Sequence, residues 1–380
     1  MTTAGTCRAG HVEERPLIDE LRRLTPEIRA LAPRIEQDRE VPGHLIDRLA
    51  ALGVFRLSAP RAAGGAEAEP AYLVEVCEEL GRADGSVGWC AMIGAATGIA
   101  LGYLPRETAA ELLADPRFLI AGVAAPMGRA VPVDGGHRIT GRWPFASACR
   151  QATWLVGGVL VADGTQPPRV RLAIMAPGDL TIHDTWDVAG LCGTGSHDIE
   201  ATDVFVPDAR LFSLAAPPVQ PGPLYGFPPL GLLALGIGAV SLGIARAAIA
   251  DFAELARGKR NPLTGETIAA KPSVRAAVAE AESLRASGLA YLKSEVAATG
   301  TDPDRRARLR LAVRTATRNA VRAVDLVYEA AGGSAVYAAG PLQRHFRDVH
   351  VATQHAMVNT DVLETVGAVL LGESVNTARL

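Results

Sequence analysis

The stretch PRFLIAGVA, residues 116–124, marks the change of pattern that decides the fold. Before it, apolar residues recur at helical spacing; after it, short runs rich in β-branched and aromatic residues alternate with glycine-containing turns. The first pattern predicts helices over Leu17–Ala32, Gly43–Leu52, Ala71–Gly81 and Ser86–Leu104. The second predicts strands over Phe118–Ala124, His137–Trp143, Trp154–Val161, Val170–Ala176, Thr181–Val188 and Ile199–Val206.

The helical pattern returns at Pro229 and continues to the C-terminal region. Short connections between long helices are typical of an antiparallel bundle. We therefore expect an α+β protein with an N-terminal helical domain (1–117), a small central β-barrel or sandwich (118–225) and a C-terminal four-helix bundle (226–380). The bundle helices are predicted over Leu230–Arg257, Lys271–Ala298, Asp304–Ala331 and Pro341–Leu371.

The composition excludes several classes of protein. The 380 residues carry a net charge of −3 and only 5% aromatic residues, whereas a nucleic-acid binder needs a basic face. The five cysteines stand singly, with no C-x-x-C spacing, which indicates a reducing compartment without disulfides or a zinc site. Charged residues and the lack of an apolar run near the N-terminus exclude a signal peptide. We expect a cytoplasmic protein.

One apolar segment calls for a membrane test. No charged residue lies between Arg210 and Arg246, and Leu230–Ala245 is nearly all apolar. Prolines before this run and glycines within it leave it short for a span of ~20 residues. We therefore expect a helix buried inside the bundle, with glycines that let neighbouring helices approach, and no membrane span.

Common cofactor and metal motifs are missing. Gly236-Ile-Gly238-Ala-Val-Ser241 comes closest to the dinucleotide fingerprint, but it ends in serine and lies in a helical run. A nicotinamide site is therefore not expected. His345, His350 and His355 recur every five residues, and each such step turns a helical side chain by ~140°. The three imidazoles point in different directions, so we predict no metal site.

Five arginines stand four residues apart on one predicted helix. A solvated or salt-bridged face is the simpler explanation, and contact with a partner subunit or with cofactor phosphates is the alternative. The five are Arg306, Arg310, Arg314, Arg318 and Arg322.

The segment GRWPFASAC, residues 141–149, carries the clearest chemical signal. It ends a predicted strand with two large aromatic residues and places a hydroxyl two residues after Phe145. In an extended strand Phe145 and Ser147 would share one face. A flat aromatic beside a hydrogen-bonding group suits a planar heteroaromatic ring, although aromatic-rich strands also serve as core.

The order of elements resembles the acyl-CoA dehydrogenase fold over nearly the whole chain. The W-x-F-x-S pattern and the terminal R-D…H resemble more closely the two-component flavin-dependent monooxygenases that share this fold. The supporting motifs are Ser86-Val87-Gly88-Trp89, Gly122 through Pro126, Gly141-Arg142-Trp143 with Phe145-Ala146-Ser147, Gly190 through Ser196, Gly332-Gly333 and Arg347-Asp348.

This resemblance implies a set of site residues. Phe145, with Trp143, falls where the family packs an aromatic on the flavin, and Ser147 falls where a hydroxyl bonds near flavin N5. The resemblance places His355 at the C4a side of the flavin. The family usually has glycine where this chain has Ala148, so the turn there can differ. The resemblance also implies that Thr194 and Ser196 lie in a loop that borders the active site. It further implies that Gly332 and Gly333 approach the cofactor of a neighbouring subunit. Lys259 and Arg260 are possible phosphate partners, and Trp89 and Met92 would help to set the size of the substrate pocket.

Residues near the end of the chain favour an oxygenase over a dehydrogenase. Many acyl-CoA dehydrogenases carry a proton-abstracting glutamate about eight residues beyond the R-D pair; here that position is Ala356, and His355 precedes it. The resemblance then implies a flavin C4a-hydroperoxide, with His355 as general base or peroxide-facing donor and Ser147 orienting the flavin. Because some dehydrogenases place the glutamate elsewhere, Glu254 and Glu280 keep open an FAD-holding dehydrogenase; a non-redox protein on the same fold is a further alternative.

The resemblance also implies partners. The expected cofactor is reduced flavin, FMNH2 or FADH2, with O2 as co-substrate and a small, aromatic or polyketide-like molecule as substrate. Since no nicotinamide motif is present, a separate NAD(P)H:flavin reductase would supply the reduced flavin. Long bundle helices and a cofactor contact across subunits suggest a homotetramer, with a dimer as the next choice.

Overall fold

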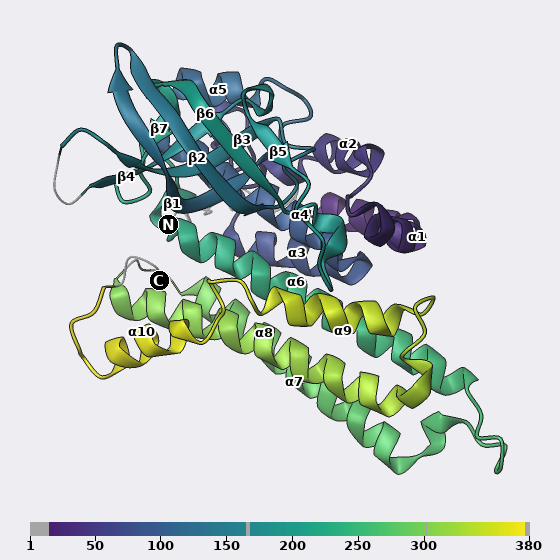
Figure 1. The fold of residues 1–380 in the computed structure, drawn as a ribbon. Coiled ribbons are helices and arrows are strands. Elements are labelled where there is room, and N and C mark those ends of the chain that lie inside the picture. Colours follow the sequence, from purple (N-terminus) through teal and green to yellow (C-terminus); the bar gives the residue numbers. More distant parts are fainter. Residues whose placement is uncertain (1–14, 165–167, 299, 301, 377–380) are drawn as a thin grey trace, which may run out of the picture.

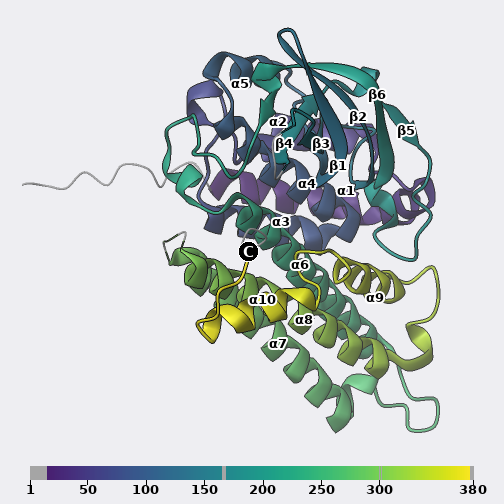
Figure 2. The same cartoon turned by 60° about the vertical axis from the view of Figure 1, so that its left-hand side comes forward.

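The computed structural model describes residues 15–164, 168–298, 300 and 302–376. Helices at the N-terminal end pack against one mixed sheet, and the C-terminal helices form a second body below both (Figures 1 and 2). This arrangement confirms the predicted α+β architecture. Helix α6 (Pro229–Gly258) runs from the sheet region into the C-terminal helices and packs against both α3 (Pro70–Ala83) and α8 (Pro303–Ala331).

The N-terminal helices follow the predicted order with three differences. Helix α1 (Arg15–Asp38) continues beyond the predicted end, with Pro26 and Pro33 inside it. Helix α4 (Gly85–Thr97) ends early and continues as a 3₁₀ turn over Gly98–Tyr103. The remaining helices are α2 (Gly43–Ala51) and α5 (Arg106–Leu113), of which α5 was not predicted.

The described strands form a single seven-stranded sheet ordered β5-β6-β2-β1-β3-β4-β7, where the sequence predicted a small barrel or sandwich. The β1–β3 pair is parallel and the other pairs are antiparallel. The predicted strand over Thr181–Val188 pairs only at its start. The strands are β1 (Ile120–Val133), β2 (Gly136–Ala146), β3 (Trp154–Val161), β4 (Arg169–Met175), β5 (Thr181–His183), β6 (His197–Pro207) and β7 (Leu211–Phe212).

Glycines bring three helices into close contact beneath the sheet. A Cβ atom at Gly243 of α6 would lie 2.2 Å from the carbonyl oxygen of Glu78 on α3, and one at Gly88 of α4 would lie 2.6 Å from the backbone of Gly81. Two segments, Gly85–Tyr103 and Pro229–Gly258, are long and apolar enough to cross a membrane, but 94% and 89% of their apolar windows are buried inside the fold. The expected buried bundle helix is therefore α6.

The C-terminal region holds α6, α7 (Pro272–Ala297), α8, α9 (Pro341–Ala352) and α10 (Asp361–Leu370). The last predicted helix, Pro341–Leu371, is in fact two helices, because the chain turns between Ala352 and Asp361. Helix α9 packs against α6 and α8, and α10 packs on α8 (Figure 2). The break matters because His355 lies within it.

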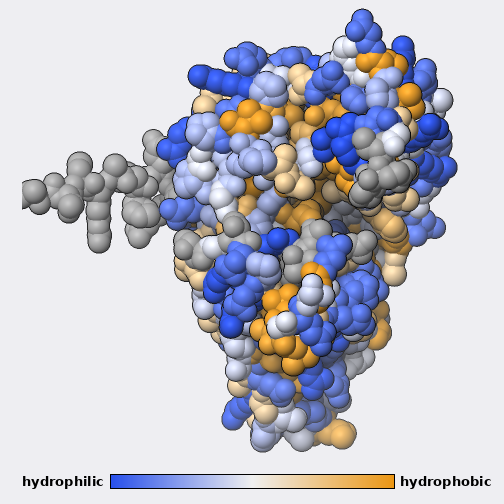
Figure 3. Space-filling model, turned by 90° about the vertical axis from the view of Figure 1, so that its left-hand side faces the viewer, coloured by the Kyte–Doolittle hydropathy of each residue, from blue (hydrophilic) through white to orange (hydrophobic). Residues whose placement is uncertain are grey.

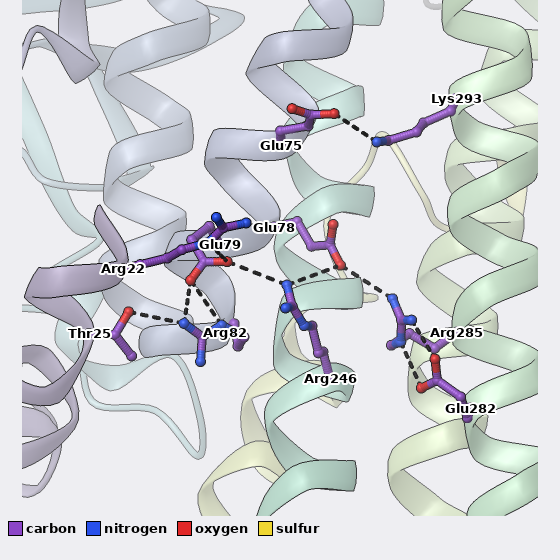
Figure 4. A network of polar contacts seen from close by, with 10 residues as sticks. All are labelled: Arg22, Thr25, Glu75, Glu78, Glu79, Arg82, Arg246, Glu282, Arg285 and Lys293. Atoms are coloured by element: carbon purple, nitrogen blue, oxygen red, sulfur yellow. Dashed lines mark hydrogen bonds and ion pairs between the residues drawn. The ribbon is translucent and has the colours of Figure 1, made fainter. Parts of the chain in front are cut away.

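A polar network joins α1, α3, α6 and α7 (Figure 4). Glu78 and Glu79 on α3 are buried. Arg246 of α6 lies 3.4 Å from Glu79 Oε2, and Arg285 of α7 lies 3.3 Å from Glu78 Oε1. Burial raises the pKa of Glu78 in spite of these cations. The network joins the N-terminal helices to the bundle through two buried carboxylates and cations that keep partial contact with water.

Candidate active site

A chain of buried hydroxyl groups lies where β2 ends beside the loop before β6. The Oγ atoms of Ser147 and Ser196 are 2.7 Å apart, and Ser196 Oγ is 2.7 Å from Thr194 Oγ1. The Thr194 hydroxyl in turn donates to the carbonyl oxygen of Leu191 at 2.8 Å. All three hydroxyl residues are at most 5% exposed. Sequence reasoning singled out these three residues, and the fold brings them together as one hydrogen-bonded group, here called the hydroxyl cluster.

The turn after β2 holds the first of these hydroxyls in place. Phe145 has φ of 67° and Ala148 has φ of 58°, a left-handed conformation that is uncommon outside glycine. The N–H of Ala148 donates to the carbonyl oxygen of Thr194 at 2.9 Å. Ala148 thus adopts the conformation that glycine favours. The turn also overturns the expectation that Phe145 and Ser147 share a strand face, because Phe145 is 68% exposed while Ser147 is buried.

Trp89 on α4 connects the hydroxyl cluster to His355. Its indole Nε1–H donates to Ser147 Oγ at 3.1 Å. Its ring lies edge-on to the His355 imidazole, with centroids 5.8 Å apart and planes at 61°. The candidate substrate residue Trp89 and the candidate catalytic residues Ser147 and His355 therefore meet at one place.

The surroundings of His355 fix its protonation. The backbone N–H of Met357 donates to His355 Nδ1 at 3.2 Å, so the neutral ring carries its proton on Nε2. Burial, aided by the nearby charge of Arg310, lowers the pKa of His355 to about 4. At neutral pH the imidazole is uncharged and has one N–H to donate.

Two of the five arginines spaced four residues apart on α8, Arg310 and Arg314, contact the turn that carries His355. Arg310 is buried, and its Nη1 lies 2.7 Å from Met357 Sδ and 3.5 Å from the Met357 carbonyl oxygen. Arg314 Nε donates to the carbonyl oxygen of Asn359 at 3.3 Å. Side chains four residues apart on a helix are rotated by ~40° relative to each other. The five arginines therefore differ in burial, from the buried Arg310 to the exposed Arg318. A uniformly solvated face is therefore wrong for this helix.

Phe145 offers an exposed aromatic surface next to the hydroxyl cluster. Its ring lies edge-on to that of Trp186, with centroids 6.2 Å apart and planes at 90°. An aromatic side chain kept exposed by a left-handed backbone is a strained arrangement of the kind found at binding sites. The exposed ring of Phe145, with the buried Trp186 behind it and the buried hydroxyls beside it, fits the planar ring of a flavin. Sequence reasoning missed Trp186; the only signal was an aromatic residue in the predicted strand Thr181–Val188.

Two predicted site residues are core residues instead. Trp143 has no exposed surface, and its Nε1–H donates to the carbonyl oxygen of Gly158 at 2.8 Å. Its ring fills the space left by glycines on neighbouring strands, because a Cβ at Gly128 would lie 2.3 Å from it. Met92 also has no exposed surface and packs against Gly236 of α6. Neither side chain can contact a ligand in this structure.

A second candidate site lies at the end of the C-terminal helices remote from the sheet (Figure 1). Lys259, Arg260 and Lys271 line a cavity of about 290 Å³ together with Gly332 at the end of α8. Arg260 Nη1 donates to the carbonyl oxygen of Gly265 at 2.8 Å, and Lys259 Nζ donates to Ser334 Oγ at 2.7 Å. The predicted residues Arg260 and Gly332 therefore lie together, apart from the hydroxyl cluster.

The other two histidines of the five-residue series have separate partners. His345 Nε2 lies 2.8 Å from Asp251 on α6, and His350 Nε2 lies 3.4 Å from Asp325 on α8. Across the residues that the structure describes, no group of three histidine, cysteine or acidic side chains is arranged to hold a metal ion.

Comparison with known proteins gives a consistent family. The model of the acyl-CoA dehydrogenase N-terminal domain matches residues 12–111, and that of the C-terminal domain matches residues 235–360. An indole-3-acetate monooxygenase of Pseudomonas putida is 32% identical over 91% of each chain. The FADH(2)-dependent resorcinol hydroxylase oxygenase component of a Rhizobium species is 30% identical over 90% of this chain and 91% of the relative.

A solved structure supports the same relationship over the whole fold. The crystal structure of the HsaA monooxygenase from Mycobacterium tuberculosis superposes with a TM-score of 0.88 at 28% identity, covering 97% of this chain and all of that one. The same relative, a flavin-dependent monooxygenase oxygenase subunit, is 32% identical over 88% of this chain and 89% of its own length in direct sequence comparison. The chain therefore belongs to the flavin-dependent monooxygenases, enzymes built on the acyl-CoA dehydrogenase fold that act as oxygenase components.

Proposed function

We propose that this enzyme takes reduced flavin from a separate NAD(P)H:flavin reductase and hydroxylates a small aromatic substrate. The observation that carries the proposal is the imidazole of His355 packed against Trp89, whose indole N–H bonds Ser147. The resemblance puts the glutamate of many dehydrogenases at the next position, which is Ala356 in this chain. The names of two relatives, which refer to indole-3-acetate and resorcinol, support an aromatic substrate for this chain.

The carboxylates that could serve a dehydrogenase lie elsewhere. Glu254, Glu280, Asp361 and Glu364 are exposed, so hydration would stabilise each carboxylate and weaken it as a base toward an α-carbon proton. This disfavours desaturation of an acyl thioester.

Phe145, supported by the edge-on contact with the buried Trp186, would hold the flavin ring, and Ser147 would hydrogen-bond its edge. Reduced flavin, when bound, supplies the two electrons with which O2 gives one oxygen atom to the substrate and the other to water. Phe145 would provide the apolar surface that excludes water from the ring. Because the Thr194 hydroxyl donates to the Leu191 carbonyl, Ser196 donates to Thr194 and Ser147 donates to Ser196. Ser147 Oγ also accepts from Trp89, so its remaining lone pair would accept from the flavin edge without reorganisation.

His355 acts as a hydrogen-bond donor rather than as a general base. Its Nδ1 lone pair already accepts the Met357 N–H, and a neutral ring with a pKa of about 4 is a weak base at pH 7. Nε2–H remains available and would donate a hydrogen bond to a negatively charged oxygen atom of the reacting groups. Arg310 favours this state, because its positive charge opposes a second one on the imidazole.

The cavity lined by Lys259, Arg260, Lys271 and Gly332 would receive phosphates of a flavin bound to a neighbouring subunit. Apolar side chains at Leu363, Leu370 and Leu371 are exposed on and after α10, on a face where hydrophobic surface gathers (Figure 3). Both features support a homo-oligomer, and we infer a homotetramer.

Four described cysteines are free and buried, which supports a cytoplasmic location.

A coupled assay tests the proposal. Purified chain with NADH and O2 should oxidise no NADH, and addition of a flavin reductase with an indole or phenol should give hydroxylated product. Arg260→Ala should weaken binding of FADH2 but not of FMNH2, because FMNH2 lacks the second phosphate and the adenosine. NADH oxidation by the chain alone, or reduction of its flavin by an acyl thioester, would contradict the proposal.

A further inference from the structure

The loop between β5 and β6 is fastened to helix α9 over residues 189–191. Arg347 Nη1 donates to the carbonyl oxygen of Ala189 at 2.7 Å, and the N–H of Leu191 donates to Asp348 Oδ1 at 2.6 Å. Between these bonds, Gly190 lies so close to α9 that a Cβ there would be 2.5 Å from the Arg347 carbonyl oxygen. Three consecutive residues of the loop therefore dock on two consecutive residues of the helix.

Asp348 also stands at the start of α4. A Cβ at Gly85, the first residue of α4, would lie 2.9 Å from Asp348 Oδ2, so the missing side chain makes room for the carboxylate. The positive end of the helix dipole at this terminus favours a negative group. Asp84 caps the same terminus by accepting from the N–H groups of Ser86 and Val87.

The carboxylate is costly to keep in this place. Asp348 is 3% exposed, and burial together with the neighbouring Asp84 raises its pKa to about 7. A buried carboxyl with one strong backbone hydrogen bond is retained where geometry demands it, because an apolar side chain of similar size would fold at lower cost.

The three segments that meet at Asp348 each carry part of the active site. Helix α4 carries Trp89, the loop carries Thr194 and Ser196, and α9 leads into the turn with His355. We propose that Asp348 is a positioning residue that holds the hydroxyl cluster in register with Trp89 and His355. The inference rests on the proposed function, since it assigns Asp348 a part in the same reaction without contact to substrate.

Four variants separate this role from general stability. Asp348→Ala removes the acceptor, Asp348→Asn keeps an acceptor oxygen without charge, and Gly190→Ala pushes the loop from α9 without changing any polar group. Gly178→Ala is the matched control, because a Cβ there meets nothing within 4 Å.

The first measurement is hydrogen exchange in the flavin-free protein. Asp348→Ala and Gly190→Ala should raise exchange about tenfold or more in peptides covering residues 189–196, with other core peptides unchanged. Asp348→Asn should fall between Asp348→Ala and the parent, and Gly178→Ala should match the parent. Equal exchange in the parent, Asp348→Ala and Gly190→Ala, or a rise spread over the whole chain, would overturn the inference.

The second measurement is the lifetime of the transient absorbance that follows mixing of the anaerobic reduced-flavin complex with O2. Asp348→Ala and Gly190→Ala should shorten it about tenfold, while the dissociation constant of reduced flavin changes less than threefold; Asp348→Asn should restore part of the lifetime. Unchanged lifetimes with a normal parent transient would overturn the positioning role alone. A parent that shows no transient would contradict the proposed function, and the exchange data would still decide the contacts of Asp348.

Discussion

The indole N–H of Trp89 donates a hydrogen bond to the hydroxyl of Ser147 at 3.1 Å and so ties helix α4 to the turn that follows strand β2. The ring of the same side chain packs against the His355 imidazole, with centroids 5.8 Å apart. One side chain from the N-terminal helices therefore connects the sheet to the C-terminal helices. The proposed active site lies where all three parts of the fold touch.

Loss of the Ser147 hydroxyl should shorten the oxygen-dependent transient. Ser147→Ala leaves the Trp89 N–H buried without its acceptor, at a cost of about 1–3 kcal/mol, and breaks the hydroxyl cluster at its first member. We expect decay about tenfold faster in stopped-flow absorbance. Ser294→Ala, an exposed serine on α7, is the control. Equal lifetimes in Ser147→Ala and the parent would remove Ser147 from the reaction.

Two substitutions of His355 distinguish a donor from a base. Glutamine keeps an N–H near the position of Nε2 but cannot take up a proton, whereas phenylalanine keeps only the ring shape. If His355 donates, His355→Gln should hydroxylate within about tenfold of the parent, and His355→Phe should lose ~10²-fold or more. The exposed His44→Gln serves as the control. Equal loss in both His355 variants would favour the base.

The partly buried imidazole of His355 should also make stability depend on pH. Its folded pKa of about 4 lies below the ordinary value of 6.5, so the unfolded chain binds the extra proton first as pH falls. His355 therefore makes the fold less stable as pH decreases from about 6.5 to 4, by at most ~3 kcal/mol. In urea unfolding, the stability of the His355→Phe variant relative to the parent should increase as pH falls over this range. A difference independent of pH would show that His355 titrates normally.

Removal of the Arg310 charge should change the titration of His355. Arg310→Met loses the contact with the Met357 carbonyl and the repulsion between two cations. We expect the pKa of His355, followed by NMR, to rise from about 4 toward 6.5. Arg318→Met, which removes an exposed arginine from the same helix, should leave that pKa in place. If the pKa of His355 is the same in both variants as in the parent, the charge of Arg310 does not lower it.

The network of Figure 4 should contribute unequally to stability. Arg246→Met leaves the buried Glu78 and Glu79 with fewer cations and should cost about 3 kcal/mol in denaturant unfolding. Lys293→Met breaks an exposed pair with Glu75 and should cost less than ~1 kcal/mol. A larger loss for Lys293→Met would contradict the dominance of buried charges.

The resemblance to the family, rather than composition or spacing, pointed to the site residues that the structure brings together. Ser147, Thr194, Ser196, Trp89 and His355 stand in motifs whose order along the chain is that of the family, and the structure brings these five together. The turn over 145–148 could not be predicted as it is, because the left-handed Ala148 is held by a hydrogen bond to Thr194 from a distant loop.

The sequence did not predict which of the candidate site residues are buried in the core. Trp143 is aromatic and lies in the motif that the family uses at the flavin. However, glycines on other strands leave the space that buries its ring, and the way these strands align depends on the whole fold. Similarly, the break between α9 and α10 sits in a sequence with helical character. Its carbonyl groups at Met357 and Asn359 are taken up by Arg310 and Arg314 from another helix.

Rapid mixing of the anaerobic complex of this chain and reduced flavin with oxygenated buffer is the most direct test of the central claim, that His355 and the hydroxyl cluster serve a reaction of reduced flavin with O2. A transient species that outlasts the one in free solution, and whose decay quickens in His355→Phe and Ser147→Ala, is the predicted result. Flavin oxidation as fast as in free solution, with no dependence on either residue, would contradict it.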